Sequence, residues 1–252
     1  MKRPVKILLI LLGAAVLTVL VVVANVSRSR SQVRGIEVAI RYGDTPVLVS
    51  EQTVVDTVLG AMPALLQQSI KSVDCDRVAD AARNVPFLTR VSAAVSVSGK
   101  VVVRADQRRP IARLYYGSRE LYMDGEGGLF PTSSSGNCNV LVAGGDFKEP
   151  LRMDSLNAQT RALWEVALYL DDHRDYKNFI DQIYVLSNGD VMMVPKVGSH
   201  VIELGDADNL DEKFSNLVAF YRKGMPRAGW DTYSKVSLKF KEQVVCTKKQ
   251  NK

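Results

Sequence analysis

Hydrophobic positions divide this chain into one long uncharged stretch and a larger part in which short apolar patterns alternate with turn signals. Residues 7–26, ILLILLGAAVLTVLVVVANV, contain no charged side chain. Twenty residues of α-helix span about 30 Å, the thickness of the hydrocarbon core of a bilayer. Val22–Ala24 would suit signal cleavage, but the apolar core of a signal peptide is usually only about 7–15 residues long. We therefore expect 7–26 to be an uncleaved transmembrane helix.

The orientation of this span follows from the mass on each side of it. Basic residues flank both ends, with Lys2, Arg3 and Lys6 before the span and Arg28, Arg30 and Arg34 after it. The positive-inside rule is therefore almost balanced. Only six residues precede the span, and a large polar part follows it. The sequence favours a short cytoplasmic segment, 1–6, and a main body outside the cell membrane.

The next part of the chain, 33–107, shows the order strand, helix, helix, strand, strand. Apolar and polar residues alternate over 36–42, which is the period of a half-buried strand. Ser50 and Asp74 stand where N-caps are expected before two short amphipathic patterns. Two further alternating runs flank a Ser–Gly turn at 98–99.

A second part, 108–246, consists mainly of strand patterns and hairpin signals. Gly117–Ser118 separates two alternating runs, and Asn188–Gly189 separates two more. Asn–Gly favours a type I′ turn, in which both central residues have positive φ. The pattern over 33–246 therefore predicts an α+β protein in which a β-α-α-β-β domain precedes a mixed β-rich domain with helices.

Two longer helices and a short tail complete this expectation. Asp154 or Ser155 would cap the first helix, and Asp208 or Asn209 would cap the second. Val244–Cys246 is expected to form a final short strand, and the polar and basic residues 247–252 the tail.

Charge outside the membrane flanks is close to neutral. Five of the 33 Lys and Arg residues lie in the first 30 positions, which leaves 28 against 27 acidic residues. Nucleic-acid binding needs a clustered positive face, so this composition argues against a nucleic-acid partner. Arg104, Arg108, Arg109 and Arg113 are the densest basic group, and they fall where the two predicted domains join. A solvated strand face is the simpler interpretation, and a contact with a partner or between domains is the alternative.

Candidate catalytic and metal-binding residues are few. His173 and His200 have no partner at the spacing of a metal site or a catalytic triad, and we expect both to be solvated surface residues. Gly125, Gly127 and Gly128 lie between predicted strands and do not open a helix, so they indicate a turn and not a phosphate loop. We expect no catalytic site, cofactor, metal or small-molecule substrate.

Three cysteines, Cys75, Cys138 and Cys246, match no metal or redox motif. They are expected to be structural thiols. One pair could form a disulfide in an oxidising compartment, and the sequence does not select which.

Several stretches, taken in order, resemble the FtsQ/DivIB family of bacterial cell-division proteins. The matching stretches are Val33–Val38, Pro86–Phe87, Val91–Val103, Gln107–Ala112, Tyr122–Phe130, Ile202–Gly205 and Val236–Val245. The chain departs from the family pattern at Gln107, where an acidic residue is common, and in its very short segment before the span.

The resemblance implies a fold, a function and a location. It implies a POTRA domain over 33–107, a C-terminal β domain over 108–246 and a single-pass anchor in the cell inner membrane at the division septum, with the main body in the periplasm. It also implies a non-catalytic divisome scaffold that binds FtsB and FtsL. The alternatives are a POTRA-containing assembly or translocation module and a membrane-anchored periplasmic enzyme.

The binding site expected for such a partner is the strand Tyr233–Phe240. Its apolar half, Val236, Leu238 and Phe240, is expected to face the core, and Lys235, Ser237 and Lys239 to face outward. Lysines on an exposed strand are typical of an edge protected against aggregation, and such an edge can accept a partner strand. Tyr233, Lys235, Ser237, Lys239 and Phe240 are therefore the predicted partner-binding residues, with the four arginines of 104–113 as a second contact.

Overall fold

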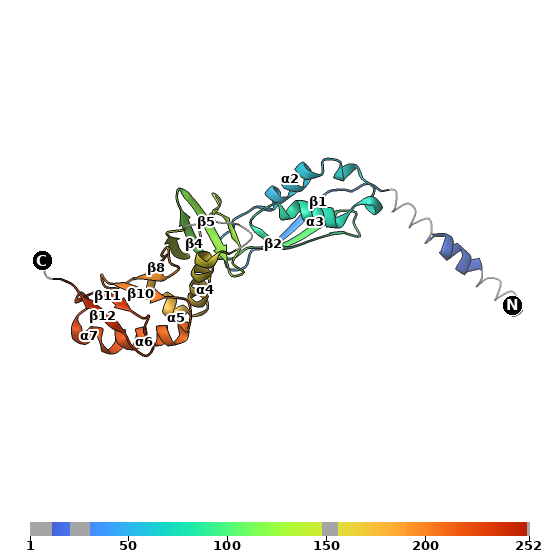
Figure 1. Cartoon of the computed structure of the whole chain (residues 1–252). Coiled ribbons are helices and arrows are strands. Elements are labelled where there is room, and N and C mark those ends of the chain that lie inside the picture. Colours follow the sequence, from blue (N-terminus) through green and yellow to red (C-terminus); the bar gives the residue numbers. More distant parts are fainter. Residues whose placement is uncertain (1–11, 21–30, 148–155, 251–252) are drawn as a thin grey trace, which may run out of the picture. The chain divides into compact units, whose positions relative to one another are not determined.

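The computed structural model describes residues 12–20, 31–147 and 156–250. The chain divides into two compact units (Figure 1). Unit 1 comprises Met1–Gly43 and Val49–Gln107, and unit 2 comprises Asp44–Leu48 and Arg108–Lys252. Each unit contains its own cluster of buried apolar side chains.

The predicted membrane span 7–26 lies largely outside the described residues, as does the segment 1–6. Of the span, the structure describes a helical stretch over residues 12–20. Within the described part of the chain, no helix combines the length and the apolar character needed to cross a bilayer.

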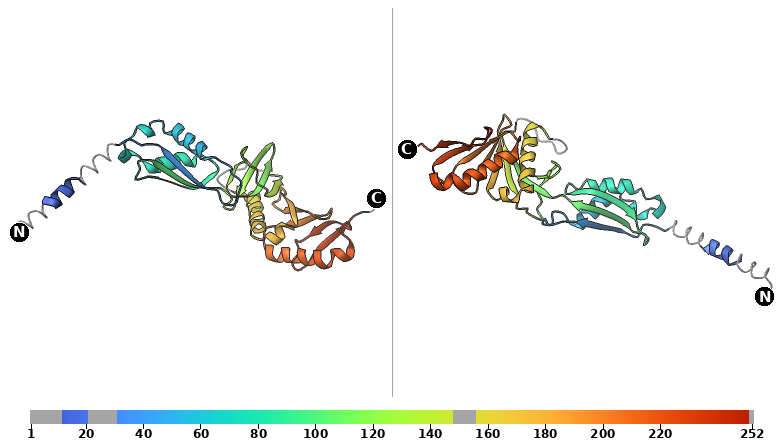
Figure 2. Two further views of the ribbon diagram at one scale, coloured as in Figure 1. Left: turned by 180° about the vertical axis from the view of Figure 1, so that it is seen from behind. Right: turned by 90° about the horizontal axis from the view of Figure 1, so that it is seen from below.

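Unit 1 is a three-stranded sheet with two helices on one of its faces. Its elements are β1 (Ile36–Arg41), α2 (Glu51–Ala61), α3 (Cys75–Arg83), β2 (Leu88–Val95) and β3 (Val101–Gln107), with short 3-10 turns at Leu65–Gln67 and Ile70–Ser72. The strand order is β1-β3-β2, in which β1 runs parallel to β3 and β2 antiparallel to it. The views in Figures 1 and 2 place α2 and α3 on the same side of this sheet. This succession of strands and helices is the one that the hydrophobic pattern predicts.

Capping explains where the two helices of unit 1 begin. The Ser50 hydroxyl accepts a hydrogen bond from the backbone N–H of Thr53 at 3.1 Å. The Asp74 carboxylate accepts from the N–H groups of Asp76 and Arg77, each at 3.1 Å. Both caps are those predicted from the sequence, because a cap is a local interaction between a side chain and the next turn of its own helix.

Unit 2 is built on a nine-stranded mixed sheet. Its strands are β4 (Pro110–Tyr116), β5 (Arg119–Asp124), β6 (Leu129–Pro131), β7 (Leu141–Gly145), β8 (Ile180–Val185), β9 (Val191–Pro195), β10 (Val201–Gly205), β11 (Tyr233–Ser237) and β12 (Val245–Lys248). Their order is β12-β11-β10-β9-β8-β7-β4-β5-β6. The pairs β4–β7, β7–β8 and β10–β11 are parallel, and the other pairs are antiparallel.

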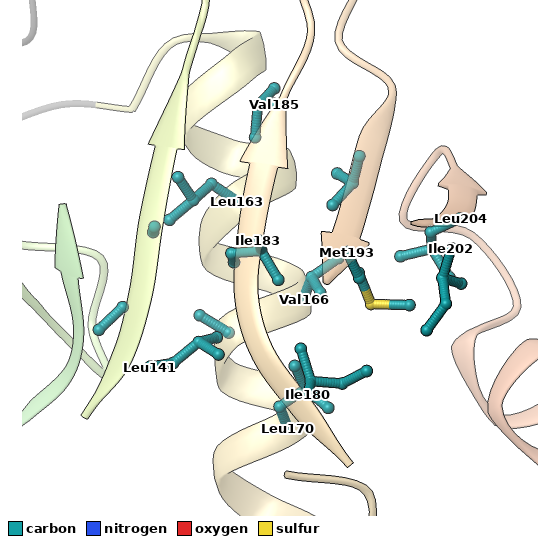
Figure 3. Packing of buried hydrophobic residues seen from close by; sticks show 14 of the residues in the cluster. Leu141, Leu163, Val166, Leu170, Ile180, Ile183, Val185, Met193, Ile202 and Leu204 are labelled. Atoms are coloured by element: carbon teal, nitrogen blue, oxygen red, sulfur yellow. The ribbon is translucent and has the colours of Figure 1, made fainter. Parts of the chain in front are cut away.

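The helices of unit 2 are α4 (Ala158–Asp172), α5 (Arg174–Lys177), α6 (Leu210–Lys223) and α7 (Met225–Ala228). Figure 3 shows Leu163, Val166 and Leu170 of α4 behind the strands, next to Ile183 of β8 and Met193 of β9. All five side chains are essentially buried. Each such side chain contributes about 1.5–3 kcal/mol of transfer free energy, so this layer holds α4 to the sheet.

The starts of α4 and α6 differ from the sequence prediction. The expected caps Asp154 and Ser155 lie outside the described residues, and α4 is capped instead by Asn157 in a capping box with Thr160. Asn209 does occupy the N-cap position of α6, but its φ is 52° and its side chain does not cap the helix.

The hairpin between β8 and β9 is confirmed, but the predicted type I′ turn is wrong. Gly189 has φ of 93°, whereas Asn188 is not among the described residues with positive φ. The N–H of Gly189 donates to the carbonyl of Leu186 at 2.9 Å, and the N–H of Leu186 donates to the carbonyl of Asp190 at 2.8 Å. The left-handed conformation is thus confined to the glycine, as in a three-residue loop closed by a glycine bulge.

Replacing Gly189 with valine is expected to destabilise unit 2 by about 1–3 kcal/mol, because a β-branched residue is strained at this φ. Asn188→Ala removes only the side-chain hydrogen bonds to Asp190 and should cost less than about 1 kcal/mol. Thermal unfolding followed by tryptophan fluorescence reports on this unit, since Trp164 and Trp230 both lie in it. Equal losses for the two variants would contradict the assigned turn.

Candidate protein-binding edge

The predicted edge strand is not an edge of the sheet. β11 runs parallel to β10 on one side, with Ile202 opposite Val236, and antiparallel to β12 on the other, with Cys246 opposite Val236. The last strand, β12, therefore covers the backbone that was expected to meet a partner. Among the residues that the structure describes, β12 has a strand neighbour on one side only, so it is the edge at this end of the sheet.

The backbone of β12 presents hydrogen-bonding groups outward. The N–H of Lys249 donates to the carbonyl of Thr232, next to β11, at 3.0 Å. Since backbone groups alternate in direction along a strand, those of Thr247 and Val245 also face β11. The N–H and C=O groups of Cys246 and Lys248 consequently point to the open side.

The side chains of β12 anchor the strand on one face and leave the other exposed. Val244, just before the strand, and Cys246 pack against the core cluster of unit 2. Burial raises the pKa of the Cys246 thiol. Val245, Thr247 and Lys248 are exposed. The strand is therefore held in the sheet through its inner face while its edge and outer face remain accessible.

Two of the five predicted partner-binding residues are not where the alternation placed them. Val236 and Leu238 are buried as predicted, but Ser237, expected to face outward, is only 3% exposed. Phe240, expected in the core, is 55% exposed. The strand ends at Ser237, and the chain then turns toward β12, so the alternation does not continue to Phe240.

The predicted lysines are held by acids of their own unit. Lys235 Nζ lies 3.3 Å from a carboxylate oxygen of Glu203, and Lys239 Nζ lies 2.8 Å from one of Asp190. The hydrogen bond from Lys239 lowers the pKa of Asp190, against a smaller opposing effect of burial. Tyr233 is half-buried against Phe220, with ring centroids 5.9 Å apart.

A small cavity lies beyond the end of β11. It encloses about 160 Å³, and its lining includes Asp206, Glu212, Lys213, Phe240 and Gln243. The loop before β12 is tied to α6 here, because the N–H of Glu242 donates to a Glu212 carboxylate oxygen at 3.0 Å. Glu242 has φ of 59°, which is uncommon for a residue other than glycine. The exposed Phe240 thus lines a polar hollow between the start of α6 and the loop that precedes β12.

The four arginines of 104–113 do not form one free basic surface. Arg104 belongs to unit 1, and the other three belong to unit 2. Each of these three faces an acid: Arg108 Nη1 is 2.8 Å from Asp124, Arg109 Nη1 is 2.6 Å from Asp171, and Arg113 Nη1 is 3.7 Å from Glu120.

The prediction that both histidines are solvated is wrong for His200. His173 is exposed and stacks on Tyr169. His200 is 2% exposed, and its Nε2 lies 2.7 Å from the hydroxyl of Tyr221 on α6. Its Nδ1 has no hydrogen-bond partner among the described residues. The residue joins β10 to α6 inside the core, and its sequence neighbours, Ser199 and Gly198, give no apolar signal of that burial.

Acidification is expected to destabilise unit 2 through His200. Burial lowers the pKa of His200, and the charge of Lys249 adds to this effect. The unfolded histidine takes up a proton near pH 6.5, whereas the folded one does so only at lower pH. Below about pH 6.5 the unfolded state therefore binds more protons than the folded state does. The free energy of unfolding of unit 2 consequently decreases as the pH falls from about 6.5 to the lower pKa of the folded histidine.

The melting temperature of the wild type should therefore fall from pH 7.5 to pH 5.5. The neutral variant His200→Gln should be less stable at pH 7.5 but should lose less on acidification. An equal fall in melting temperature for the two proteins between pH 7.5 and pH 5.5 would show that His200 does not cause the acid destabilisation.

The remaining sequence candidates are structural features. In the 125–128 loop, the Asp124 carboxylate accepts from the N–H of Glu126 at 3.0 Å and from that of Gly128 at 2.8 Å. Cys75, Cys138 and Cys246 are not disulfide-bonded. Across residues 12–20, 31–147 and 156–250, no three His, Cys, Asp or Glu side chains are grouped so as to hold a metal ion.

Sequence reasoning thus missed the residues of β12 as the open edge. The final short strand predicted at Val244–Cys246 exists as β12, but it spans Val245–Lys248 and so includes two residues that were expected in the tail. Its position outside β11 could not be inferred, because alternation shows which face of a strand is buried and not which strand lies beside it.

In a comparison with known protein families, one family model matches most of unit 2. The family model described as "FtsQ/DivIB, C-terminal related" matches residues 109–247, which is more than half of the 252-residue chain. No curated protein matches this chain.

Proposed function

Because this chain belongs to the FtsQ/DivIB family of cell-division proteins, we propose that it is a non-catalytic scaffold of the divisome that binds the FtsB–FtsL pair through the open edge of β12. In this role it links early and late division proteins at the septum.

The observation that carries the proposal is the free edge of a large, well-packed sheet. β12 is anchored by Val244 and Cys246, while the backbone groups of Cys246 and Lys248 point away from β11. A partner strand can pair with these groups, in which case main-chain hydrogen bonds supply affinity and flanking side chains supply selectivity. The exposed Val245, on β12 itself, adds apolar area beside the edge.

The proposed arrangement assigns 33–107 to a POTRA domain and 108–246 to the C-terminal β domain. The β-α-α-β-β order of unit 1 supports the first assignment. The uncharged segment 7–26 supports an anchor in the inner membrane, with 1–6 in the cytoplasm and both units in the periplasm.

Capture and hydrogen exchange together test this proposal. The full chain, solubilised in a neutral detergent, is mixed with purified FtsB–FtsL pair, and amide exchange is compared with and without the pair. We expect co-elution and slower exchange at Cys246 and Lys248, whose N–H groups point to the open side. Absence of co-elution would overturn the partner, and protection confined to other segments would overturn the surface.

A further inference from the structure

The open face of the unit 1 sheet carries a shallow depression that contains three arginines. One comes from each strand: Arg41 from β1, Arg90 from β2 and Arg104 from β3. The depression has a volume of about 440 Å³, and Asp106 and Ala39 also line it. All of these residues lie in unit 1, whose helices cover the opposite face.

Asp106 gathers two of the three arginines and fixes their guanidinium groups. Arg41 donates to both of its carboxylate oxygens, through Nε at 2.8 Å and Nη2 at 2.7 Å. Arg90 Nε lies 2.5 Å from the same carboxylate. Asp106 is only 8% exposed, and one bidentate arginine already neutralises it. The second arginine therefore leaves this group with a net positive charge.

Arg104 adds a further positive charge beside this group. It is exposed and forms no ion pair with any residue that the structure describes. Its cross-strand neighbours are Ala39 on β1 and Ser92 on β2. Because both are small, the space around the Arg104 guanidinium is open to a ligand.

Backbone strain accompanies the placement of Arg90. Its φ is 49°, and the pairing of β2 with β3 shifts between Thr89 and Ser92, which marks a bulge. Bulges commonly re-aim a side chain, and strained backbone is concentrated at functional positions. Here the bulge brings the guanidinium of Arg90 to the carboxylate of Asp106, whose charge Arg41 already neutralises.

The positive charge is local. Residues 31–43 and 49–107 contain eight Lys and Arg residues and seven Asp and Glu residues, so the described part of unit 1 is nearly neutral. Five of the acids, Glu51, Asp56, Asp74, Asp76 and Asp80, lie on α2 and α3 or at the N-cap of α3. The open sheet face is consequently basic and the helical layer acidic.

We propose that this depression, the arginine depression, binds an acidic peptide segment of a partner protein, with carboxylates of the peptide on Arg104 and Arg90. A carboxylate matches the planar fork of an arginine, and two neighbouring guanidinium groups suit two acidic side chains on one segment. An anionic membrane surface would select a broad basic face, whereas this charge is confined to one depression of a nearly neutral unit. The inference does not depend on the β12 edge or on the partner proposed for it.

Binding of a defined acidic peptide tests this site. The full chain in neutral detergent is titrated against fluorescein-labelled hexaglutamate at low salt, with hexaglutamine as the uncharged control. We expect binding of hexaglutamate alone, weakening as salt is added. Arg104→Glu should weaken it by about tenfold or more, because it replaces a charge-assisted bond with a repulsion.

Arg77→Glu is the matched control, since it makes the same charge change at an exposed position of α3. It should alter hexaglutamate affinity by less than about twofold, and melting curves should show both variants folded. Equal weakening by the two variants, or no weakening by Arg104→Glu, would overturn the site.

A competition experiment with lipid vesicles distinguishes an acidic peptide from an anionic lipid as the ligand. The full chain is reconstituted in neutral phosphatidylcholine vesicles, and phosphatidylglycerol vesicles are added as a competitor for hexaglutamate. Failure of these vesicles to displace the peptide supports the proposal. Displacement of hexaglutamate by phosphatidylglycerol vesicles, but not by phosphatidylcholine vesicles at the same lipid concentration, would overturn it in favour of a lipid headgroup.

Discussion

Replacing Cys246 with proline is expected to weaken the proposed binding of the FtsB–FtsL pair by about 100-fold or more while the sheet stays folded. The N–H of Cys246 points away from β11, so proline removes no bond of the β11–β12 ladder. It does remove a donor that a partner strand would use, and its ring lies in the path of that strand. The partner carbonyl left without its donor costs about 1–3 kcal/mol, and the clash with the proline ring adds to this loss, so the total corresponds to about 100-fold in affinity.

Two variants of the same strand separate edge pairing from other effects. Cys246→Val keeps the N–H and a side chain of similar size, so it should bind almost as the wild type does. Thr247→Pro removes an N–H that faces β11, so it should lower the melting temperature of unit 2 as well as binding. Titration of the full chain with the FtsB–FtsL pair, together with melting curves, provides both readouts. Wild-type affinity in a folded Cys246→Pro protein would show that β12 is not the docking edge.

Replacing Asp124 with alanine is expected to destabilise unit 2 by about 2–4 kcal/mol. The buried carboxylate accepts hydrogen bonds from the N–H groups of Glu126 and Gly128 and lies 2.8 Å from Arg108 Nη1. The N–H of partly buried Gly128 loses a hydrogen bond to a charged group, worth about 1.5–3 kcal/mol, whereas the N–H of exposed Glu126 can regain a bond to water. Arg108 is partly exposed and regains solvent, so its share of the loss is smaller.

Asp124→Asn and Asp181→Ala are informative companions. The asparagine keeps a side-chain oxygen for the backbone donors and loses only the charge, so it should cost less than alanine. Asp181 lies exposed on β8, and its truncation should change stability by less than about 0.5 kcal/mol. Chemical unfolding followed by tryptophan fluorescence is well suited, since the indole N–H of Trp164 donates to the carbonyl of Gly125 in this same loop. A loss for Asp124→Ala no larger than that for Asp181→Ala would show that the loop closes without the carboxylate.

Local patterns in the sequence were sufficient for most of the elements and several of their ends. Ser50 and Asp74 were identified as caps because the groups that they bind lie two or three residues away. The hairpin at 188–189 was likewise identified from two adjacent residues. Its turn type was not, because Asn–Gly is compatible with more than one loop geometry and the pairing of β8 with β9 selects among them.

Only the tertiary structure decided which strand forms the edge. The alternation of Val236 and Leu238 correctly indicated their burial. However, β12 pairs with β11 on the side away from β10, so β12 and not β11 is the outermost strand. The buried His200 contacts Tyr221, which lies 21 residues away in the sequence. Arg109 pairs with Asp171, which is still further away in the sequence. The amino-acid sequence by itself therefore determined the elements, since their periodicity and caps are local. Contacts between segments far apart in the chain decided which residues are free to bind a partner. The local hydrophobic pattern of a single strand does not indicate these contacts.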